Sequence, residues 1–442
     1  MTSSAKPQTS EGSKNHPIFS YIVIAISILV MVLSFFSRIK ISDFPLTRDE
    51  GSYGYLGKMA MQGKIPYLEI FEMKPPMLFY FYGLGGKIFG THDLGLRYLA
   101  LFLTALSSFF LYKLIKKYST TGSSMLAASS YAFFSLNMYC FGFSMVAEHF
   151  INAILLGLGL IILDRDSKNY MILLAGFLFG LAVLTKQTMA LFLPLFLIIL
   201  WLKSENKKLK RISFFLTGGI VSLMLLFMFL ISTNALESAK FWLIDYSSAY
   251  TESISVEKGK QYFTYFLKNI FNFSPLIFFV SILGILSSFI NIKTKNVKLF
   301  LIYMISAFVT IIPGLRFYGQ YWIILLPALS MGLAYLIDNT SKLNFYFGTG
   351  FSILIGILFF IEFSSKKQYY FANKVPKQME KLYEGNPFEA IKNISQYASK
   401  IMKPSDKLMI LGSEPQIYLY TNKIAPSNHV YLGFLSRNIK EN

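Results

Sequence analysis

Long runs of apolar residues, separated by short polar segments, dominate the pattern of this chain. Many of these runs reach the roughly 18 residues that a helix needs to cross a hydrocarbon layer about 30 Å thick. The pattern predicts an all-α polytopic membrane protein with about eleven transmembrane helices, at residues 18–36, 98–115, 124–142, 146–163, 171–186, 187–202, 212–232, 274–292, 299–314, 321–337 and 345–363.

One further apolar segment, at 77–90, differs from these runs because it is short and contains Gly83, Gly85, Gly86 and Lys87. A segment of this length and composition suits a re-entrant or interfacial helix better than a full span. We therefore expect it to lie at the edge of the bundle.

The first 17 residues are polar and weakly basic, and an apolar run from Ile18 to Phe36 follows them. This run is too long for the hydrophobic core of a signal peptide, and no small-x-small cleavage site follows it. We expect residues 1–17 to form a cytoplasmic N-terminal tip and the run to be a retained first span.

The distribution of charge predicts which loops face the cytoplasm. With the N-terminus inside, the strongly basic loops 203–211 and 293–298 are cytoplasmic, as the positive-inside rule requires. The first loop (37–97), loop 234–273 and the tail 364–442 are then external. The tail is also basic, but long segments cross the membrane largely regardless of charge.

Composition supports the membrane assignment, because 54% of the residues are hydrophobic and only 15% are charged. The formal net charge of +19 would suggest nucleic-acid binding in a soluble protein. Here much of the Lys and Arg flanks apolar spans, where it sets orientation and meets anionic lipids, so we expect no nucleic-acid partner. The single cysteine, Cys140, excludes a disulfide framework within the chain.

The residue pattern of the tail predicts a small α/β external segment after the transmembrane domain of residues 18–363. Residues 376–402 have a helical pattern with a break at 385–387, and Lys407–Gly412 and Ile417–Thr421 resemble short strands. The segment 364–442 is near the minimum size for an independent core, and it could be part of something longer.

The first external loop carries two groups of candidate site residues. Asp49 and Glu50 are adjacent carboxylates, and such a pair raises the proton affinity of its members, so one can serve as a base. The alternative is that they only cap the N-terminus of a helix. Lys74 precedes Pro75-Pro76, which exclude a helix there, so its ammonium could bind a phosphate or only extend to lipid head groups.

Three further charged residues lie at minimal connections between predicted spans. Glu148 opens a span, where it can stabilise the helix dipole or act as a functional acid close to hydrocarbon. Lys186 and Arg316 lie in external turns, where they can bind an anion or extend toward head groups.

All six residues fall on the external face in this topology, and together they suit sugar transfer from a lipid phosphate. A carboxylate can deprotonate or orient an acceptor hydroxyl, while cations bind the leaving phosphate. A nearby carboxylate also stabilises an anomeric carbon that becomes oxocarbenium-like.

At these residues the chain resembles the polytopic GT-C glycosyltransferases of the protein O-mannosyltransferase and lipid A aminoarabinose transferase type. The resemblance covers roughly residues 18–340 and rests on the order of motifs. In this sequence they are Asp49-Glu50, Lys74-Pro75-Pro76, Glu148, Leu184-Thr185-Lys186, Arg316-Phe317-Tyr318 with Tyr321, and Leu326-Pro327-Ala328-Leu329.

The resemblance implies a GT-C fold, a polyprenyl-phosphate sugar donor, inversion at the anomeric carbon and catalysis outside the cytoplasm. By similarity, Asp49 is the catalytic base, with Glu50 beside it and Glu148 as a second acid near the acceptor. Lys74, Lys186 and Arg316 would contact the donor phosphate. Glu72 departs from the pattern of some relatives because Met73 separates it from Lys74, so a donor or metal role for Glu72 is not implied.

Several alternatives stay open at this point. The acceptor can be a glycan, a lipid or a protein, and a divalent cation could bind if Asp49, Glu50 and Glu148 converge. We expect an integral protein of the bacterial inner (plasma) membrane. A transporter or flippase of lipid-linked sugars is the second hypothesis, but such proteins need charged or broken helices near mid-membrane and often have internal symmetry. A non-catalytic assembly protein is the third.

Overall fold

The computed structural model describes residues 17–204, 207–291, 293–371 and 387–430 of the chain. Over these residues the fold is built from helices. An isolated β-bridge connects Pro66 and Ile70. The N-terminal tip and part of the tail lie outside the described residues.

Each of the eleven predicted spans coincides with a helix. The helices are α1 (Pro17–Lys40), α4 (Asp93–Lys116), α5 (Thr121–Phe134), α6 (Ala147–Ile162), α7 (Asn169–Val183), α8 (Leu193–Lys203), α9 (Lys208–Ser232), α13 (Pro275–Ser288), α14 (Lys295–Val309), α15 (Leu326–Leu343) and α16 (Phe345–Ser365).

The number of membrane crossings is not confirmed. Among the described residues, five helices are long and apolar enough to cross a membrane, or six if the bent pair α12 (Val256–Phe273) and α13 counts as one. Four other apolar helical stretches in the described ranges have 10–17 residues and are too short for this test: Ala147–Ile162, Asn169–Val183, Gln187–Lys203 and Asn296–Val309. Two of the predicted spans begin with a 3₁₀ turn, since η2 (Gln187–Phe192) precedes α8 and η6 (Gly319–Leu325) precedes α15.

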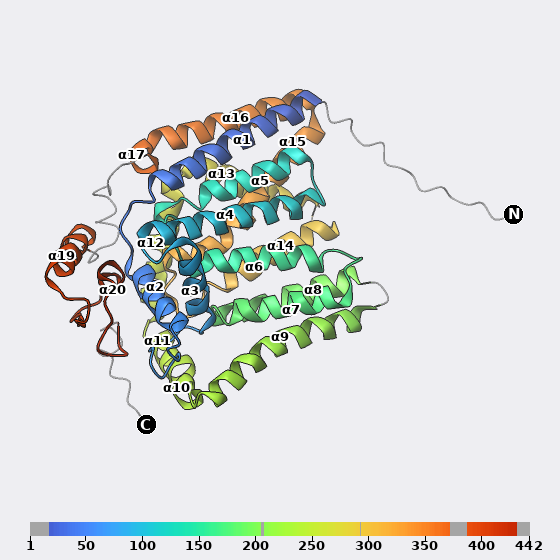
Figure 1. Cartoon of the computed structure of the whole chain (residues 1–442). Coiled ribbons are helices and arrows are strands. Elements are labelled where there is room, and N and C mark those ends of the chain that lie inside the picture. Colours follow the sequence, from blue (N-terminus) through green and yellow to red (C-terminus); the bar gives the residue numbers. More distant parts are fainter. Residues whose placement is uncertain (1–16, 205–206, 292, 372–386, 431–442) are drawn as a thin grey trace.

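The helices pack side by side as a bundle, with α1 against α5 and α16, α7 against α9, and α13 against α15 (Figure 1). Glycine permits the closest of these approaches. A Cβ atom at Gly176 of α7 would lie 1.9 Å from the carbonyl oxygen of Phe215, and one at Gly218 of α9 would lie 2.0 Å from that of Leu173. Side chains at these two positions would force α7 and α9 apart.

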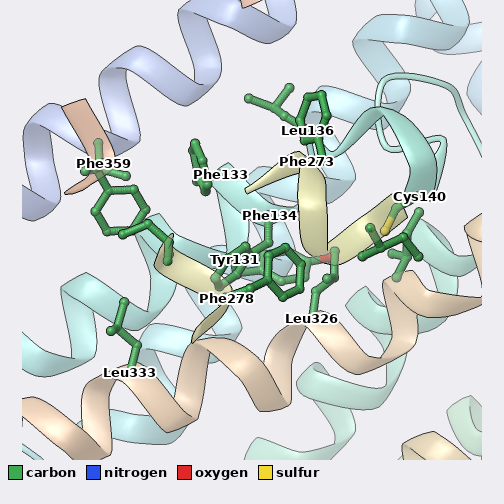
Figure 2. Close-up of a cluster of buried hydrophobic side chains, with 14 of the residues drawn as sticks. Tyr131, Phe133, Phe134, Leu136, Cys140, Phe273, Phe278, Leu326, Leu333 and Phe359 are labelled. Atoms are coloured by element: carbon green, nitrogen blue, oxygen red, sulfur yellow. The ribbon is translucent and has the colours of Figure 1, made fainter. Parts of the chain in front are cut away.

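The largest core cluster joins α5, α13, α15 and α16. Figure 2 shows that it is rich in aromatic rings, and the Phe133 ring packs edge-on against Phe359, with centroids 5.1 Å apart. Cys140 is fully buried in the same cluster, as expected for a small apolar core residue.

The short helices gather at one end of the bundle, which we call the site end (Figure 1). They are α2 (Arg48–Met61), α3 (Met77–Phe89), α10 (Leu236–Lys240), α11 (Ser247–Glu252), α12, α17 (Lys367–Tyr370), α19 (Phe388–Ile401) and α20 (Gln416–Thr421). A π-helical turn, η4 (Phe241–Tyr246), joins α10 to α11. α1 begins at the opposite end, where α8 ends and α9 begins. The segments that the charge pattern places on one side therefore lie together.

Two of these short helices have shapes that suit an interface. α3 forms as a helix of 13 residues within the predicted segment 77–90, too short to span a bilayer. α12 meets α13 at a bend of 107°. Its exposed residues include Lys258 and Lys260 as well as apolar Val256 and Tyr265, a combination that suits a helix lying along a membrane surface.

The predicted strands of the tail are wrong. Residues Ile417–Thr421 form most of α20, whereas residues 407–410 have no regular secondary structure and residues 411 and 412 lie in a bend. The backbone N–H of Leu408 donates to the Ile424 carbonyl (3.3 Å). A short apolar run does not distinguish a strand from a helix, and here the helical form buries Ile417, Tyr418 and Thr421. The predicted helix 376–402 is confirmed from Phe388 as α19, and its earlier part lies outside the described residues.

α20 packs directly on α2. The rings of Tyr55 and Tyr418 lie 4.9 Å apart, and the backbone N–H of Leu46 donates to the Tyr420 hydroxyl (2.7 Å). A Cβ atom at Gly51 would lie 2.4 Å from the Cα of Gln416, so α20 touches the backbone of α2. The tail thus covers the helix that begins next to Asp49.

Candidate functional site

Asp49 lies in the first turn of α2, where the local sequence determines its position. Thr47 is the N-cap, and its side chain and that of Glu50 form a reciprocal capping box that starts the helix. The Asp49 side chain is partly exposed, whereas Glu50 is fully buried. The two adjacent carboxylates therefore have different surroundings.

Glu50 is occupied by structural contacts. One carboxylate oxygen accepts hydrogen bonds from the backbone N–H and hydroxyl of Thr47 (2.9 and 3.1 Å). The other accepts from the backbone N–H of Met145 (2.6 Å) and pairs with the buried guanidinium of Arg97. These contacts join α2, α4 and the turn before α6, so the geometry gives Glu50 a structural rather than a chemical task.

The Lys74 segment returns along the site end after a tight turn. Pro75 and Pro76 keep it extended, and the hydroxyl of Tyr67, a residue with a positive φ of 72°, donates to the Lys74 carbonyl (2.9 Å). The Lys74 side chain is partly exposed, and Glu72 is 4% exposed. α3 then begins at Met77, whose backbone N–H donates to the Leu184 carbonyl beside Lys186 (3.1 Å).

Glu148 and Lys186 form a buried ion pair between the start of α6 and the turn before η2, with Nζ and Oε1 2.7 Å apart. The Lys186 ammonium also lies 3.5 Å from the centre of the Tyr321 ring. Neither side chain extends to lipid head groups, since their residues are 2% and 7% exposed. The pair brings α6, η2 and η6 together.

Arg316 sits in a strained turn before η6. Leu315 (φ 49°) and Phe317 (φ 45°) on either side adopt the left-handed conformation that bulky residues avoid, and such strain is concentrated at functional sites. The guanidinium donates to the Tyr250 carbonyl (3.0 Å) and the Ser253 hydroxyl (2.8 Å) and covers the Tyr250 ring at 3.6 Å. Arg316 is therefore buried and fixed to the end of α11.

Electrostatic interactions join these groups into one cluster. Burial raises the pKa of Asp49 above its usual range, Lys74 opposes that rise, and Glu148 adds to it. Burial also raises the pKa of Glu72 to about 7, which Lys74 opposes and Asp49 increases. Asp49, Lys74, Glu148 and Lys186 thus share one site, and Arg316 reaches it through Tyr321 and Tyr250. Of the six predicted residues, Glu50 is the one whose carboxylate is directed away from this cluster, toward Arg97 and Met145.

The described residues contain no group of three His, Cys, Asp or Glu side chains that could hold a metal ion. Asp49 and Glu148 lie in the shared site, but Glu50 is turned toward Arg97 and Met145. The three carboxylates proposed for a divalent cation therefore do not converge as one set.

Three site residues were not predicted from the sequence. Gln320 directs its amide Nε2 toward Asp49 Oδ2 at 3.5 Å, Tyr321 covers Lys186, and Tyr53 lies one turn after Asp49 on α2. Gln320 and Tyr321 follow Arg316 closely in the sequence, and this position in the Arg316 motif could have indicated that they belong to the site. Tyr53 is four residues from Asp49, and such residues share a helix face.

Comparisons with known proteins identify the fold. The model of the family described as Dolichyl-phosphate-mannose-protein mannosyltransferase matches residues 73–231. Among solved structures, ArnT from Cupriavidus metallidurans bound to undecaprenyl phosphate matches with a TM-score of 0.60 and 14% identity, over 91% of this chain and 85% of that one. This chain has the GT-C fold of the protein O-mannosyltransferase and ArnT type. The resemblance indicated by the motifs is confirmed.

A second GT-C protein has the same fold. The oligosaccharyltransferase AglB from Archaeoglobus fulgidus, in complex with an inhibitory peptide and a dolichol-phosphate, matches with a TM-score of 0.57 and 13% identity, over 92% of this chain and 64% of that one. A comparison with curated protein sequences finds no significant match. With its long apolar helices and this fold, the chain is an integral membrane protein.

Proposed function

We propose that this protein transfers a sugar from a polyprenyl-phosphate donor to an acceptor hydroxyl, with Asp49 as the base. The observation that carries the proposal is the shared site of Asp49, Lys74 and the Glu148–Lys186 pair, with Arg316 beside it. Support comes from the GT-C relatives, whose structures hold undecaprenyl phosphate or dolichol-phosphate.

In the proposed reaction the acceptor oxygen forms a bond to the anomeric carbon as the bond from that carbon to the phosphate oxygen breaks. The acceptor proton passes to Asp49, and the phosphate leaves with the bonding electrons. A single displacement of this kind inverts the anomeric configuration. Asp49 suits the base because the residue is partly exposed, and because burial raises its pKa and so increases its affinity for a proton.

The cations have different tasks in this proposal. Lys74 binds the leaving phosphate, because its side chain is partly exposed and lies at the head of α3. Lys186 and Arg316 form the positive wall behind it, while Lys186 also pairs with Glu148, with Nζ and Oε1 2.7 Å apart. Glu148 then provides negative charge near the developing oxocarbenium ion.

An apolar cavity of about 330 Å³ supports a lipid donor. It lies between α12, α13, α14 and η6, and its lining includes Leu267, Phe308 and Trp322. Trp322 donates its indole N–H to the Phe317 carbonyl (2.9 Å), directly beside Arg316. Trp322 therefore links the wall of the cavity to the turn that contains Arg316, and part of a polyprenyl chain can be buried in the cavity.

The proposal extends to the side of the membrane and the acceptor. We infer that the protein lies in the bacterial plasma membrane and that its site end is on the side away from the cytoplasm, because the basic loops join helices at the opposite end. The tail 364–442 is then external. The acceptor is a hydroxyl of a glycan, a lipid or a protein.

Substitution of Asp49 tests the proposal. Asp49→Asn keeps the side-chain volume but removes the base, so we expect sugar transfer to fall by about 100-fold or more. The measurement is transfer of radiolabelled sugar from the polyprenyl-phosphate donors of the native membrane, with expression and thermal unfolding recorded in parallel.

Asp43→Asn is the matched control, because Asp43 is an exposed carboxylate on the same segment. We expect it to keep full activity. Wild-type rates in the Asp49→Asn protein would remove Asp49 from the mechanism.

A further inference from the structure

Gln320 lies in η6 between two residues that are closely packed. A Cβ atom at Gly319 would lie 1.8 Å from the Tyr139 carbonyl oxygen, so η6 contacts the short helix η1 (Met138–Cys140) directly. On the other side Tyr321 covers Lys186. The backbone on both sides of Gln320 is therefore fixed by packing.

The charge of Asp49 determines which way the Gln320 amide faces. An ionised carboxylate only accepts hydrogen bonds, so the NH₂ group must face it, and Nε2 lies 3.5 Å from Asp49 Oδ2. The amide oxygen then points away from Asp49. It is buried and has no hydrogen-bond partner among the described residues. A buried acceptor without a donor is costly unless a ligand supplies one.

We propose that Gln320 contacts the substrate: its amide NH₂ orients Asp49, and its amide oxygen accepts a hydrogen bond from a sugar hydroxyl beside the reacting carbon. This inference rests on the proposed function. It adds a specificity residue to the site, because a sugar that lacks this hydroxyl leaves the amide oxygen unpaired.

The chemistry of the reaction limits which hydroxyl can donate a hydrogen bond to the Gln320 amide oxygen. The phosphate oxygens of the donor carry no proton for the amide oxygen, and the attacking hydroxyl gives its only proton to Asp49. The nearest remaining donor is the hydroxyl on C2 of the transferred sugar, next to the anomeric carbon, where hydrogen bonds strengthen in the transition state. A hydroxyl of a glycan acceptor is the other source.

The contact between Gln320 and Asp49 can be tested without turnover. In Gln320→Leu the carboxylate loses an N–H donor, so its protonated form persists to higher pH. Carbodiimide labels protonated carboxyls, and peptide mass spectrometry of the full-length protein gives the midpoint pH for Asp49. We expect the midpoint to rise by roughly half to one pH unit in Gln320→Leu. The control Gln62→Leu changes an exposed glutamine at the end of α2 and should leave the midpoint unchanged. An unchanged midpoint in Gln320→Leu would overturn the contact.

Donor discrimination tests the sugar hydroxyl. Undecaprenyl-phosphate mannose and its 2-deoxy analogue are supplied to wild type and Gln320→Leu in lipid vesicles. The ratio of kcat/KM for the two donors should fall at least tenfold in the variant, and the intrinsic reactivity of the analogue cancels in this comparison. The same ratio in both proteins would overturn the assignment of the hydroxyl to the donor sugar. A parallel comparison of two glycan acceptors, with and without the neighbouring hydroxyl, then decides whether the acceptor supplies this hydroxyl. A wild type that transfers sugar neither from these donors nor from the polyprenyl-phosphate donors of the native membrane counts against the proposed function itself, while the labelling result still decides the contact with Asp49.

Discussion

Glu72 is a buried carboxylate whose ionisation opposes folding. Its pKa rises from 4.5 to about 7, mainly because burial penalises the charged form. Below pH 4.5 the group is neutral in both states, so its contribution to stability is fully retained there. As the pH rises from 4.5 to 7, the unfolded chain ionises first and the folded state loses stability relative to it.

Glu72→Gln should therefore stabilise the protein above pH 7 and have little effect below pH 4.5. The neutral amide does not ionise, so the variant avoids a decrease in the free energy of unfolding that amounts to at most about 3 kcal/mol. Thermal unfolding in detergent between pH 4 and pH 8 measures the effect for the variant and the wild type. A difference in Tm that does not increase with pH would contradict the assignment.

At the residue scale, the sequence identified charged groups near the site but not which contacts each of them makes. Thr47 and Glu50 have the spacing of a capping box, a signal that could have separated the structural Glu50 from Asp49. The partner of Glu50 was not predictable, because Arg97 lies in another helix. Gln320 could not be found from its residue type, since its role depends on the distance to Asp49.

At the scale of elements, the Glu50–Arg97 pair connects α2 to α4. Arg97 also donates to the Pro45 carbonyl (2.9 Å), and its guanidinium lies 5.0 Å from the centre of the Phe143 ring. The pair is essentially inaccessible to solvent. Removing one partner leaves the other charge buried and uncompensated.

Arg97→Met should thus reduce the free energy of unfolding by about 3–5 kcal/mol, and Glu50→Gln in the same chain should restore part of the loss. Thermal unfolding of the single and double variants measures this coupling. Lys64→Met is the control because the Lys64–Glu69 pair is exposed, and it should cost less than about 1 kcal/mol. Equal effects of Arg97→Met and Lys64→Met would contradict the structural role of the buried pair.

The existence of the helices was predictable, but their lengths were not. Hydrophobic runs such as 187–202 and 321–337 include 3₁₀ turns at their starts, which leave the apolar pattern unchanged but shorten the α-helix. The strand assignment for Ile417–Thr421 failed because its helical form depends on α2, which lies more than 350 residues earlier.

At the scale of the whole molecule, the tail and α2 form one unit at the site end (Figure 1). Glu414, just before α20, pairs with Arg48 beside Asp49, and the Asn428 carbonyl accepts from the backbone N–H of Phe71 (3.3 Å). The tail therefore connects the segment of Asp49 to the segment of Glu72 and Lys74. The sequence could place these segments on one side by charge, but not their contacts.

Gly51→Ala tests this connection, because its methyl group would meet the backbone of Gln416 at 2.4 Å. We expect α20 to detach, the tail to become sensitive to protease and sugar transfer to fall by about tenfold or more, since small displacements of positioned groups are costly in catalysis. Gly350→Ala is the matched control, because nothing lies within 4 Å of a Cβ atom there. A protected tail and full activity in Gly51→Ala would show that α20 does not position Asp49.

The central claim is that the cluster at the site end breaks a sugar–phosphate bond and forms a new glycosidic bond. The most direct measurement uses purified protein in vesicles with a doubly labelled polyprenyl-phosphate sugar and a hydroxyl acceptor, and it follows both labels by mass spectrometry. The account predicts one polyprenyl phosphate released for each sugar attached to the acceptor, with the anomeric configuration inverted. Movement of the intact lipid across the bilayer with no covalent product would contradict it.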